Sequence, residues 1–518
     1  MKKISLKDDR VIVVIGSGAS GGTVVENLCK SGLDVVLIEA GKFIQAKEFY
    51  QDENAAFNQL AWKDKRISSG DWNITKDNPN YPAWLCQAVG GTSIHWTGTA
   101  LRMKDYEFNP LSTYGSVEGA NLIDWPINLK DLEVYYDLAE KKMGVSGTNG
   151  LPQHPTINNF KIMYHGAVKA GYKEISKGRL AINSVEYDNR PPSNQDGFTI
   201  SGDKIMSKWS TAYIEIPRAL KTGHLDLRTS SRAIKIEIDK HGHAEGVVFV
   251  DKNGVLKKQL CSMVVLAANA IETPRILLNS HSKRFPNGLA NGSNLVGKNF
   301  MRHMTSSVWS VFEKPVRMYR GEMMPGLVSD ESYHNCKRNF VAGYYIQLLS
   351  LSLPAIASSI QPGLWGKDFS WAMDHYGNMA GLYGCGEDMP QLDNKITLSD
   401  ENDLYGVPIA EVHYSDHPND IKMRESSYLK MENIHKLSGA IKSYKTPPYP
   451  ASHNMGTTRM SNDPSEGVTD KWGKTHEVSN IFIADGSCFS SSSAANPTLT
   501  IVALALRQSE KIKSILGK

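Results

Sequence analysis

Cysteine is scarce in this sequence, and its six positions form no pattern. No two cysteines are spaced as C-x-x-C, which argues against a zinc site, an iron-sulfur cluster and a disulfide framework. We therefore expect no metal site and six buried free thiols: Cys29, Cys86, Cys261, Cys336, Cys385 and Cys488.

Long apolar runs and a strong net charge are also absent. A membrane-spanning helix needs about 18 or more consecutive apolar residues, and no such run occurs. The net charge of +4 over 518 residues gives no reason to expect nucleic acid or an anionic membrane as a partner. Met1-Lys2-Lys3 could begin a signal peptide, but the apolar run that follows is needed as a strand of the fold. We expect a cytoplasmic protein unless a partner subunit exports it; a small partner subunit or a homo-oligomer stays open.

The N-terminus has the pattern of a dinucleotide-binding βαβ unit. Residues 11–15 are a continuous apolar run, typical of a strand buried on both faces, and a glycine loop follows at 16–21. The three glycines of a G-x-G-x-x-G loop permit a tight turn, close approach to a pyrophosphate and close helix packing. A second strand at 34–38 ends on an acid about 20 residues after the loop, where it can accept hydrogen bonds from ribose. The predicted contacts are Gly16, Gly18, Ser20, Gly21, Glu39 and Ala40.

Four further segments together resemble one family. They are Gln87-Ala-Val-Gly-Gly-Thr-Ser-Ile-His-Trp-Thr-Gly98, the strand-helix segment 264–278, His453-Asn-Met-Gly-Thr-Thr-Arg-Met460 and Ala495-Asn-Pro-Thr-Leu-Thr500. With the glycine loop they are similar to the glucose-methanol-choline (GMC) oxidoreductases, in the branch of pyranose oxidase, glycoside 3-oxidase and bacterial FAD sugar dehydrogenases. The resemblance runs from residue 11 to about residue 511 and implies FAD as the cofactor.

The resemblance also implies the catalytic pair. Oxidation of an alcohol by a flavin moves a hydride to the flavin and needs a base for the hydroxyl proton, and histidine suits this role near neutral pH. By resemblance His453 is this base, and Asn496 holds the substrate oxygen. His303 follows Arg302, where relatives have Asp-His-Pro, so the resemblance assigns it no role.

Other segments are expected to contact the flavin. In pyranose oxidase a histidine that matches His95 is joined covalently to the flavin; here we favour non-covalent FAD, and a link through His95 stays open. Thr97 is expected near the flavin N5 edge. By the same resemblance the remaining predicted contacts with FAD are Gly90, Gly91, Thr92, Trp96, Ala233, Ala268, Asp485, Gly486, Asn496, Pro497 and Thr498.

The fold class that we expect is α/β, with a Rossmann-like FAD-binding domain and a discontinuous α+β substrate domain built on an antiparallel sheet. The FAD domain would comprise residues 1–150, 215–302 and 449–518, and the substrate domain 151–214 and 303–448. Residues 226–239 and 244–250 are predicted to form a β-meander. The segments 308–312, 340–349 and 395–398 are predicted strands over the flavin, and 351–384 is predicted to be a loop or lid without helix or strand.

The sequence thus predicts an FAD-dependent oxidoreductase that oxidises a hydroxyl of a sugar or glycoside to a carbonyl, with oxygen or another electron acceptor. The alternatives are an aminoglycoside, aminocyclitol or other non-sugar alcohol as substrate, a lyase of the same fold without net redox, and a non-enzymatic flavoprotein. Gln347, Asp374, His375, Tyr376 and Glu387 are polar residues that could reach a substrate, but no motif assigns them a role.

Overall fold

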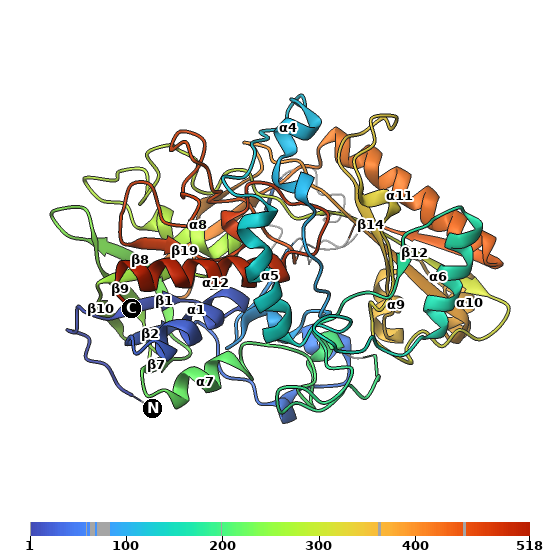
Figure 1. The fold of residues 1–518 in the computed structure, drawn as a ribbon, viewed down its shortest axis with the longest axis horizontal. Coiled ribbons are helices and arrows are strands. Elements are labelled where there is room, and N and C mark those ends of the chain that lie inside the picture. Colours follow the sequence, from blue (N-terminus) through green and yellow to red (C-terminus); the bar gives the residue numbers. More distant parts are fainter. Residues whose placement is uncertain are drawn as a thin grey trace.

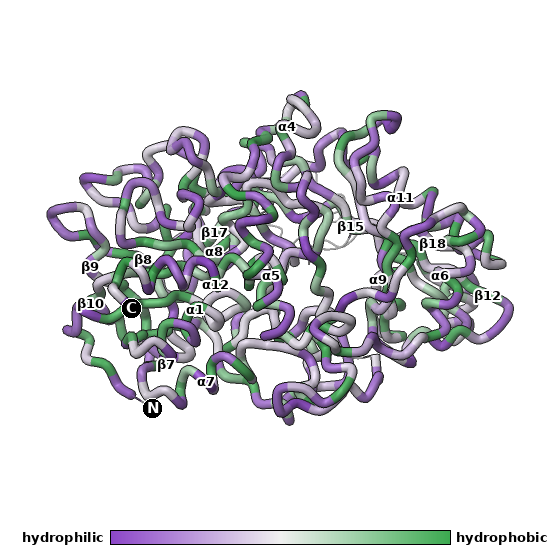
Figure 2. Tube along the Cα trace, viewed as in Figure 1, coloured by the Kyte–Doolittle hydropathy of each residue, from purple (hydrophilic) through white to green (hydrophobic). Residues whose placement is uncertain are grey.

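A parallel sheet and an antiparallel sheet organise the two halves of the molecule (Figure 1). The structure is a computed structural model that describes residues 2–57, 60–62, 68–69, 83–197, 199–360, 364–448 and 452–518. Hydrophobic residues gather along the central strands of both halves, and hydrophilic residues dominate the outer loops (Figure 2).

The parallel sheet has five strands in the order β19-β11-β1-β2-β7. They are β1 (Ile12–Ile15), β2 (Val35–Ile38), β7 (Leu225–Arg228), β11 (Met263–Leu266) and β19 (Ile481–Ile483). Every residue of β1, β2 and β11 is buried, because both faces of the sheet are covered. The two N-terminal strands predicted from the sequence are confirmed.

Alternate residues of β1 pack on opposite layers, as the two-residue period of a strand requires. Ile12 and Val14 share a core with α1 (Ala19–Lys30), α7 (Glu215–Lys221) and the C-terminal end of α12 (Thr498–Ile515). The core around Val13 and Ile15 includes residues of α5 (Leu129–Met143) and of β8 (Arg232–Ile238) and β9 (Ala244–Val250), which with β10 (Leu256–Leu260) form a three-stranded antiparallel sheet. The predicted meander is therefore correct from residue 232 on, whereas residues 226–228 belong to the parallel sheet as part of β7.

The antiparallel sheet has six strands in the order β18-β12-β15-β14-β13-β6. They are β6 (Ile175–Ser176), β12 (Met304–Phe312), β13 (Leu327–Val328), β14 (Tyr344–Leu348), β15 (Met379–Gly386) and β18 (Ala440–Thr446). Helices α6 (Asn158–Lys169) and α11 (Pro418–Leu437) pack against this sheet. The strand predicted at 308–312 is confirmed as part of β12, and of the strand predicted at 340–349 only residues 344–348 are strand, as β14.

Two predictions for this region are wrong. Residues 351–384 are not a plain loop, because they contain α9 (Leu353–Ser359), α10 (Gly366–Asp374) and most of β15. The strand predicted at 395–398 exists as part of β16 (Lys395–Asn402), but it belongs to a separate sheet, in which β16 pairs with β17 (Pro408–His413) and β17 pairs with β4 (Ser68–Ser69). That sheet packs against α8 (Asn269–Asn279) instead of joining the six-stranded sheet.

The remaining elements are short: α2 (Glu53–Phe57), α4 (Pro110–Tyr114) and the two-stranded pair β3 (Leu60–Trp62) and β5 (Trp84–Cys86). None of the helices in the described ranges is both long and apolar enough to cross a bilayer. All six cysteines are free, but only four are buried: Cys336 is exposed and Cys86 is half-buried, contrary to the prediction.

Candidate active site

The first glycine loop joins β1 to α1 and leaves open space at one position. Gly16 has a φ of +94°, and a Cβ there would lie 2.4 Å from the carbonyl oxygen of Ala267, so a larger residue is excluded. Gly18, the N-cap of α1, has no atom within 4 Å of the Cβ it would carry. The helix N-terminus therefore faces an open space in which an anionic group can approach the backbone.

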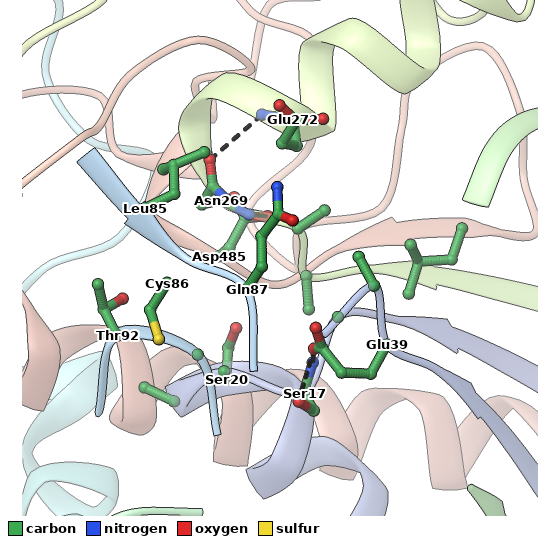
Figure 3. Close-up of a pocket in the computed structure, with 18 of the residues that line it drawn as sticks. Ser17, Ser20, Glu39, Leu85, Cys86, Gln87, Thr92, Asn269, Glu272 and Asp485 are labelled. Carbon is green, nitrogen blue, oxygen red and sulfur yellow. Dashed lines mark hydrogen bonds between the residues drawn. The ribbon is translucent and has the colours of Figure 1, made fainter. Parts of the chain in front are cut away.

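A hydrogen-bond chain ties this loop to Glu39 and to the second glycine loop. Figure 3 shows its bond between Ser17 and Glu39. Ser17 donates its Oγ hydrogen to Oε2 of Glu39 at 2.6 Å, and its Oγ accepts from the backbone N–H of Gly90 at 3.0 Å. The other carboxylate oxygen of Glu39 accepts from the N–H of Gly41 at 2.7 Å. Segments that are far apart in the sequence are thereby held around one cavity.

That cavity has a volume of about 170 Å³ and matches most of the predicted dinucleotide contacts. Gly21 and Gly90 lie behind its wall, where they support the two loops: a Cβ on Gly21 would lie 2.0 Å from the carbonyl oxygen of Gly16. The predicted contacts that line the cavity are Gly16, Gly18, Ser20, Glu39, Ala40, Gly91, Thr92, Ala233, Ala268, Asp485 and Gly486.

Asp485 uses its carboxylate to organise this wall. One oxygen accepts from the N–H of Asn269 at 2.9 Å and from the hydroxyl of Thr273 at 2.6 Å, which caps the start of α8. The other accepts from the N–H and hydroxyl of Ser487. The carboxylate thus fixes the β19 loop against α8.

A second cavity of about 520 Å³ continues from the first. Both are lined by Ala19, Trp84, Thr92, Ser452, Asn454 and Ile501, so one channel runs between the two halves of the molecule. The second cavity brings together the remaining predicted residues, His95, Trp96, Thr97, His453, Asn496, Pro497 and Thr498. Pro497 is the N-cap of α12, which therefore begins at the cavity wall.

The loop that carries His95 is held by a buried lysine that sequence reasoning missed. The Lys208 ammonium donates to the carbonyl oxygens of Ile94 at 2.9 Å, Trp96 at 2.8 Å and Thr199 at 2.5 Å. Burial lowers the pKa of Lys208 to about 7. A lysine that binds three carbonyls fixes the backbone on both sides of His95.

His95 presents an unpartnered nitrogen. Its Nδ1 lies 2.9 Å from the carbonyl oxygen of Ile200, which can only accept, so Nδ1 carries the hydrogen. Its buried Nε2 has no hydrogen-bond partner, and burial lowers the pKa of the ring to about 4. Neutral His95 therefore has a free lone pair on Nε2.

His453 lines the larger cavity and is hydrogen-bonded to His303, the residue to which the sequence assigned no role. The two Nδ1 atoms lie 2.9 Å apart, and the rings are nearly perpendicular, at 87°. Burial, and secondarily the neighbouring His303, hold the pKa of His453 well below its ordinary value. His453 is therefore neutral at neutral pH, the form in which it can accept a proton.

Asn496 is oriented by Gln347 of β14. The Gln347 amide Nε2 donates to Oδ1 of Asn496 at 2.7 Å, and Gln347 is fully enclosed. With its oxygen engaged, Asn496 has its amide N–H groups free to donate into the cavity that it lines. Gln347 thus contributes to the site by orienting the amide of Asn496.

The structure does not bring the other polar candidates to the cavity wall. Glu387 is buried and accepts from the hydroxyl of Tyr114 at 2.7 Å. Asp374, His375 and Tyr376 lie at the end of α10 and after it, away from the cavity lining. His303 and Gln347 could have been found only through their tertiary contacts, because neither lies in a sequence motif.

Two family models for GMC oxidoreductases match the chain, one over residues 11–305 and the other over 390–505. The chain therefore belongs to the GMC oxidoreductase family, whose members use FAD, and it is an enzyme that acts on CH–OH groups. This confirms the family resemblance and the α/β fold class with its parallel and antiparallel sheets.

Relatives extend over the whole chain. It is 32% identical to 2-methyl-1,2-propanediol dehydrogenase of Mycolicibacterium austroafricanum, over 98% of this chain and 95% of the relative. It is 27% identical to 6'''-hydroxyparomomycin C oxidase of Streptomyces lividus (98% and 92%) and 28% identical to the fructose dehydrogenase large subunit of Gluconobacter japonicus (97% and 97%). The crystal structure of pyridoxine 4-oxidase from Mesorbium loti shares the fold, with a TM-score of 0.64 and 16% identity over 98% of this chain and 99% of that one.

The residues present fit FAD. The open space at Gly18 and the N-terminus of α1 suit a pyrophosphate, and Glu39 beside them suits a ribose. The channel continues to the unpartnered nitrogen of His95, which the cofactor's ring end would approach. The contact of each predicted residue with FAD stays a prediction, and the channel provides space for the cofactor.

Proposed function

We propose that this enzyme oxidises a hydroxyl group of a sugar or glycoside, at a secondary carbon, to a carbonyl. The observation that carries the proposal is that His453 and Asn496 line the same cavity, which continues into the predicted cofactor channel. An alcohol needs an acceptor for its hydrogen and a donor to its oxygen, and these two side chains supply one of each.

In the proposed reaction His453 accepts the hydroxyl proton as general base, and the Asn496 amide donates to the substrate oxygen as negative charge develops on it. Bound FAD would supply the acceptor for the hydride that leaves the same substrate carbon. Asn496 cannot titrate, so a single base is expected. The same cavity is also lined by Ile200, Met324, Leu349 and Tyr383, which offer apolar surface to the ring of a sugar.

The names of the relatives support a polar alcohol as the substrate. The fructose dehydrogenase subunit is named for a sugar, and the paromomycin C oxidase for an aminoglycoside derivative. The diol dehydrogenase, at 32% identity, is named for a small non-sugar alcohol and makes such an alcohol the second candidate. An aminoglycoside is cationic, and a carboxylate in the cavity wall would favour it as a substrate. The described cavity lining contains no Asp or Glu.

The test is an anaerobic absorbance titration of the purified holoenzyme. Monosaccharides, glycosides, aminoglycosides and small diols are added separately, and bleaching of the oxidised flavin band is recorded. We expect a monosaccharide or glycoside to bleach the flavin fastest; preferential bleaching by a diol or an aminoglycoside would replace the proposed substrate class. Aldehyde or ketone release without bleaching would indicate a lyase.

The role of His453 is tested with His453→Ala. General-base catalysis contributes roughly 10²–10⁴-fold, so the rate of flavin reduction should fall by about that factor while FAD content is unchanged. His241→Ala, at an exposed loop residue, is the matched control and should behave like the native protein. A normal reduction rate in His453→Ala would remove His453 from the mechanism.

A further inference from the structure

The hydrogen bonds of His303 determine which of its nitrogens carries a hydrogen. His303 precedes β12 and is fully buried, and its Nε2 lies 3.0 Å from the carbonyl oxygen of Ser492. A carbonyl oxygen only accepts, so Nε2 must be the donor. Burial lowers the pKa of His303 to about 4, so the ring is neutral and has one N–H. Its Nδ1 therefore carries a lone pair.

The same reasoning extends to His453. Two nitrogens 2.9 Å apart must share one hydrogen, and Nδ1 of His303 has none to give. The hydrogen is therefore on Nδ1 of His453. As a neutral ring has only one N–H, Nε2 of His453 is unprotonated. Among the described residues nothing forms a hydrogen bond with this Nε2, and the ring lines the substrate cavity.

The contact of Cys385 with His303 is consistent with the lone pair on Nδ1. The Sγ of Cys385 lies 3.3 Å from the same Nδ1, and burial raises the pKa of the thiol far above its usual range. A protonated thiol is a donor, so two donors converge on one acceptor nitrogen.

The three side chains could also be viewed as metal ligands, since their ligand atoms lie within 4.8 Å of one another. The spacing favours a hydrogen bond instead. Two nitrogens bound to one tetrahedral zinc at about 2.0–2.1 Å would lie about 3.3 Å apart. The observed separation of 2.9 Å is typical of a hydrogen bond.

We propose that His303 is a positioning residue: its Nδ1 lone pair holds His453 in the Nδ1–H tautomer, so that the free lone pair on Nε2 of His453 faces the substrate cavity. Without an acceptor at this place, His453 can place its hydrogen on Nε2 and lose its capacity as a base. The inference rests on the proposed role of His453; His303 would orient His453 through their hydrogen bond without touching the substrate.

The chain offers a matched pair of variants. In His303→Asn the amide oxygen can occupy the place of Nδ1, and asparagine tolerates the left-handed backbone found here, with a φ of +70°. His303→Leu has a similar size but no acceptor. Both variants lose the donor to Ser492, and they differ in the acceptor at the place of Nδ1 and in backbone strain, because leucine rarely adopts a positive φ. They are therefore compared at equal FAD content. Cys385→Ala removes only the competing donor and is the control.

The first readout is ¹⁵N NMR of histidine-labelled holoenzyme, with the signals of His453 assigned by their loss in His453→Gln. We expect a protonated Nδ1 and an unprotonated Nε2 in the native protein, in His303→Asn and in Cys385→Ala. In His303→Leu we expect the hydrogen on Nε2 or a mixture of tautomers. A native His453 that is protonated at Nε2 would overturn the inference, as would a tautomer unchanged in His303→Leu.

The second readout is the anaerobic rate of flavin reduction. We expect a loss of about 10- to 100-fold in His303→Leu, the range for groups that orient a functional histidine, and a smaller loss in His303→Asn. Equal losses in the two variants, at equal FAD content, would contradict the acceptor role. If His303→Leu does not fold, the native and His303→Asn spectra still decide the tautomer. A normal rate in His453→Ala, with the predicted tautomer observed, would refute the proposed function and leave this inference standing.

Discussion

Gly18→Val should remove the cofactor while leaving the protein folded. Gly18 has ordinary extended backbone angles, φ −60° and ψ −166°, and the Cβ that it would carry meets nothing within 4 Å. The added side chain therefore enters the open space at the N-terminus of α1. Since valine is a poorer N-cap than glycine, we expect a loss of about 1 kcal/mol in the free energy of unfolding of the apoprotein.

The loss of FAD affinity should be larger. A hydrogen bond to a charged group contributes about 1.5–3 kcal/mol. If the valine displaces the pyrophosphate from two backbone N–H groups, binding weakens by about 3–6 kcal/mol, which is a factor of about 10² to 10⁴ in the dissociation constant. Gly18→Ala, with a smaller side chain, should lie between the native protein and Gly18→Val.

The assay compares flavin absorbance per protein with the thermal unfolding of the apoprotein. Gly21→Ala is the control, because its Cβ would lie 2.0 Å from the carbonyl oxygen of Gly16 and must shift the backbone. Overpacking of this kind costs about 1–3 kcal/mol, so Gly21→Ala should lower stability more than Gly18→Val does. A Gly18→Val protein that purifies with a full complement of FAD would refute the assignment of this space to the pyrophosphate.

Three further predictions concern the larger cavity. Gln347→Leu should lower the rate of flavin reduction by about tenfold at unchanged FAD content, because the Asn496 amide loses one hydrogen bond of about 1.5 kcal/mol that orients it. An unchanged rate in stopped-flow measurements would show that the orientation of Asn496 does not depend on Gln347. Acid precipitation of the holoenzyme should release the flavin into the supernatant, because the enclosing channel can hold FAD without a covalent bond. If the precipitate of the native protein stays yellow and that of His95→Ala does not, a covalent link between the flavin and the free Nε2 of His95 is assigned instead. Neutral burial of His95 and His303, whose pKa burial lowers to about 4, contributes stability that is lost as the pH falls from about 6.5 to about 4, because the unfolded chain binds more protons at these residues in that window. Buried Glu53 and Glu322, whose pKa burial raises to about 7, contribute in the opposite sense, so the histidine contribution is measured as a difference between variants. In urea unfolding at a series of pH values, His303→Asn should lose less stability than the native protein over this window; equal pH dependence in the two proteins would count against neutral burial of His303.

The sequence alone determined the parts of the enzyme that lie in continuous motifs. The glycine loop, the acid Glu39 and the alternating apolar strands each depend on local spacing, and that spacing is visible in one segment at a time. For this reason β1, α1 and β2 were predicted correctly. The structure places the predicted flavin-loop and C-terminal residues along one channel, and their contacts with FAD stay predictions. The error at 351–384 arose because its short helices lack a long apolar period and pack by tertiary contact.

Only the tertiary structure decided which residues support these motifs. His303 lies 150 positions from His453 in the sequence, and Gln347 lies 149 from Asn496, so no spacing rule connects them. The buried Lys208 likewise binds backbone carbonyl groups, which every residue has, so no sequence motif marks its partners. A motif specifies the groups that meet the cofactor and substrate, whereas the groups that orient them can come from any segment that the fold brings within hydrogen-bonding distance.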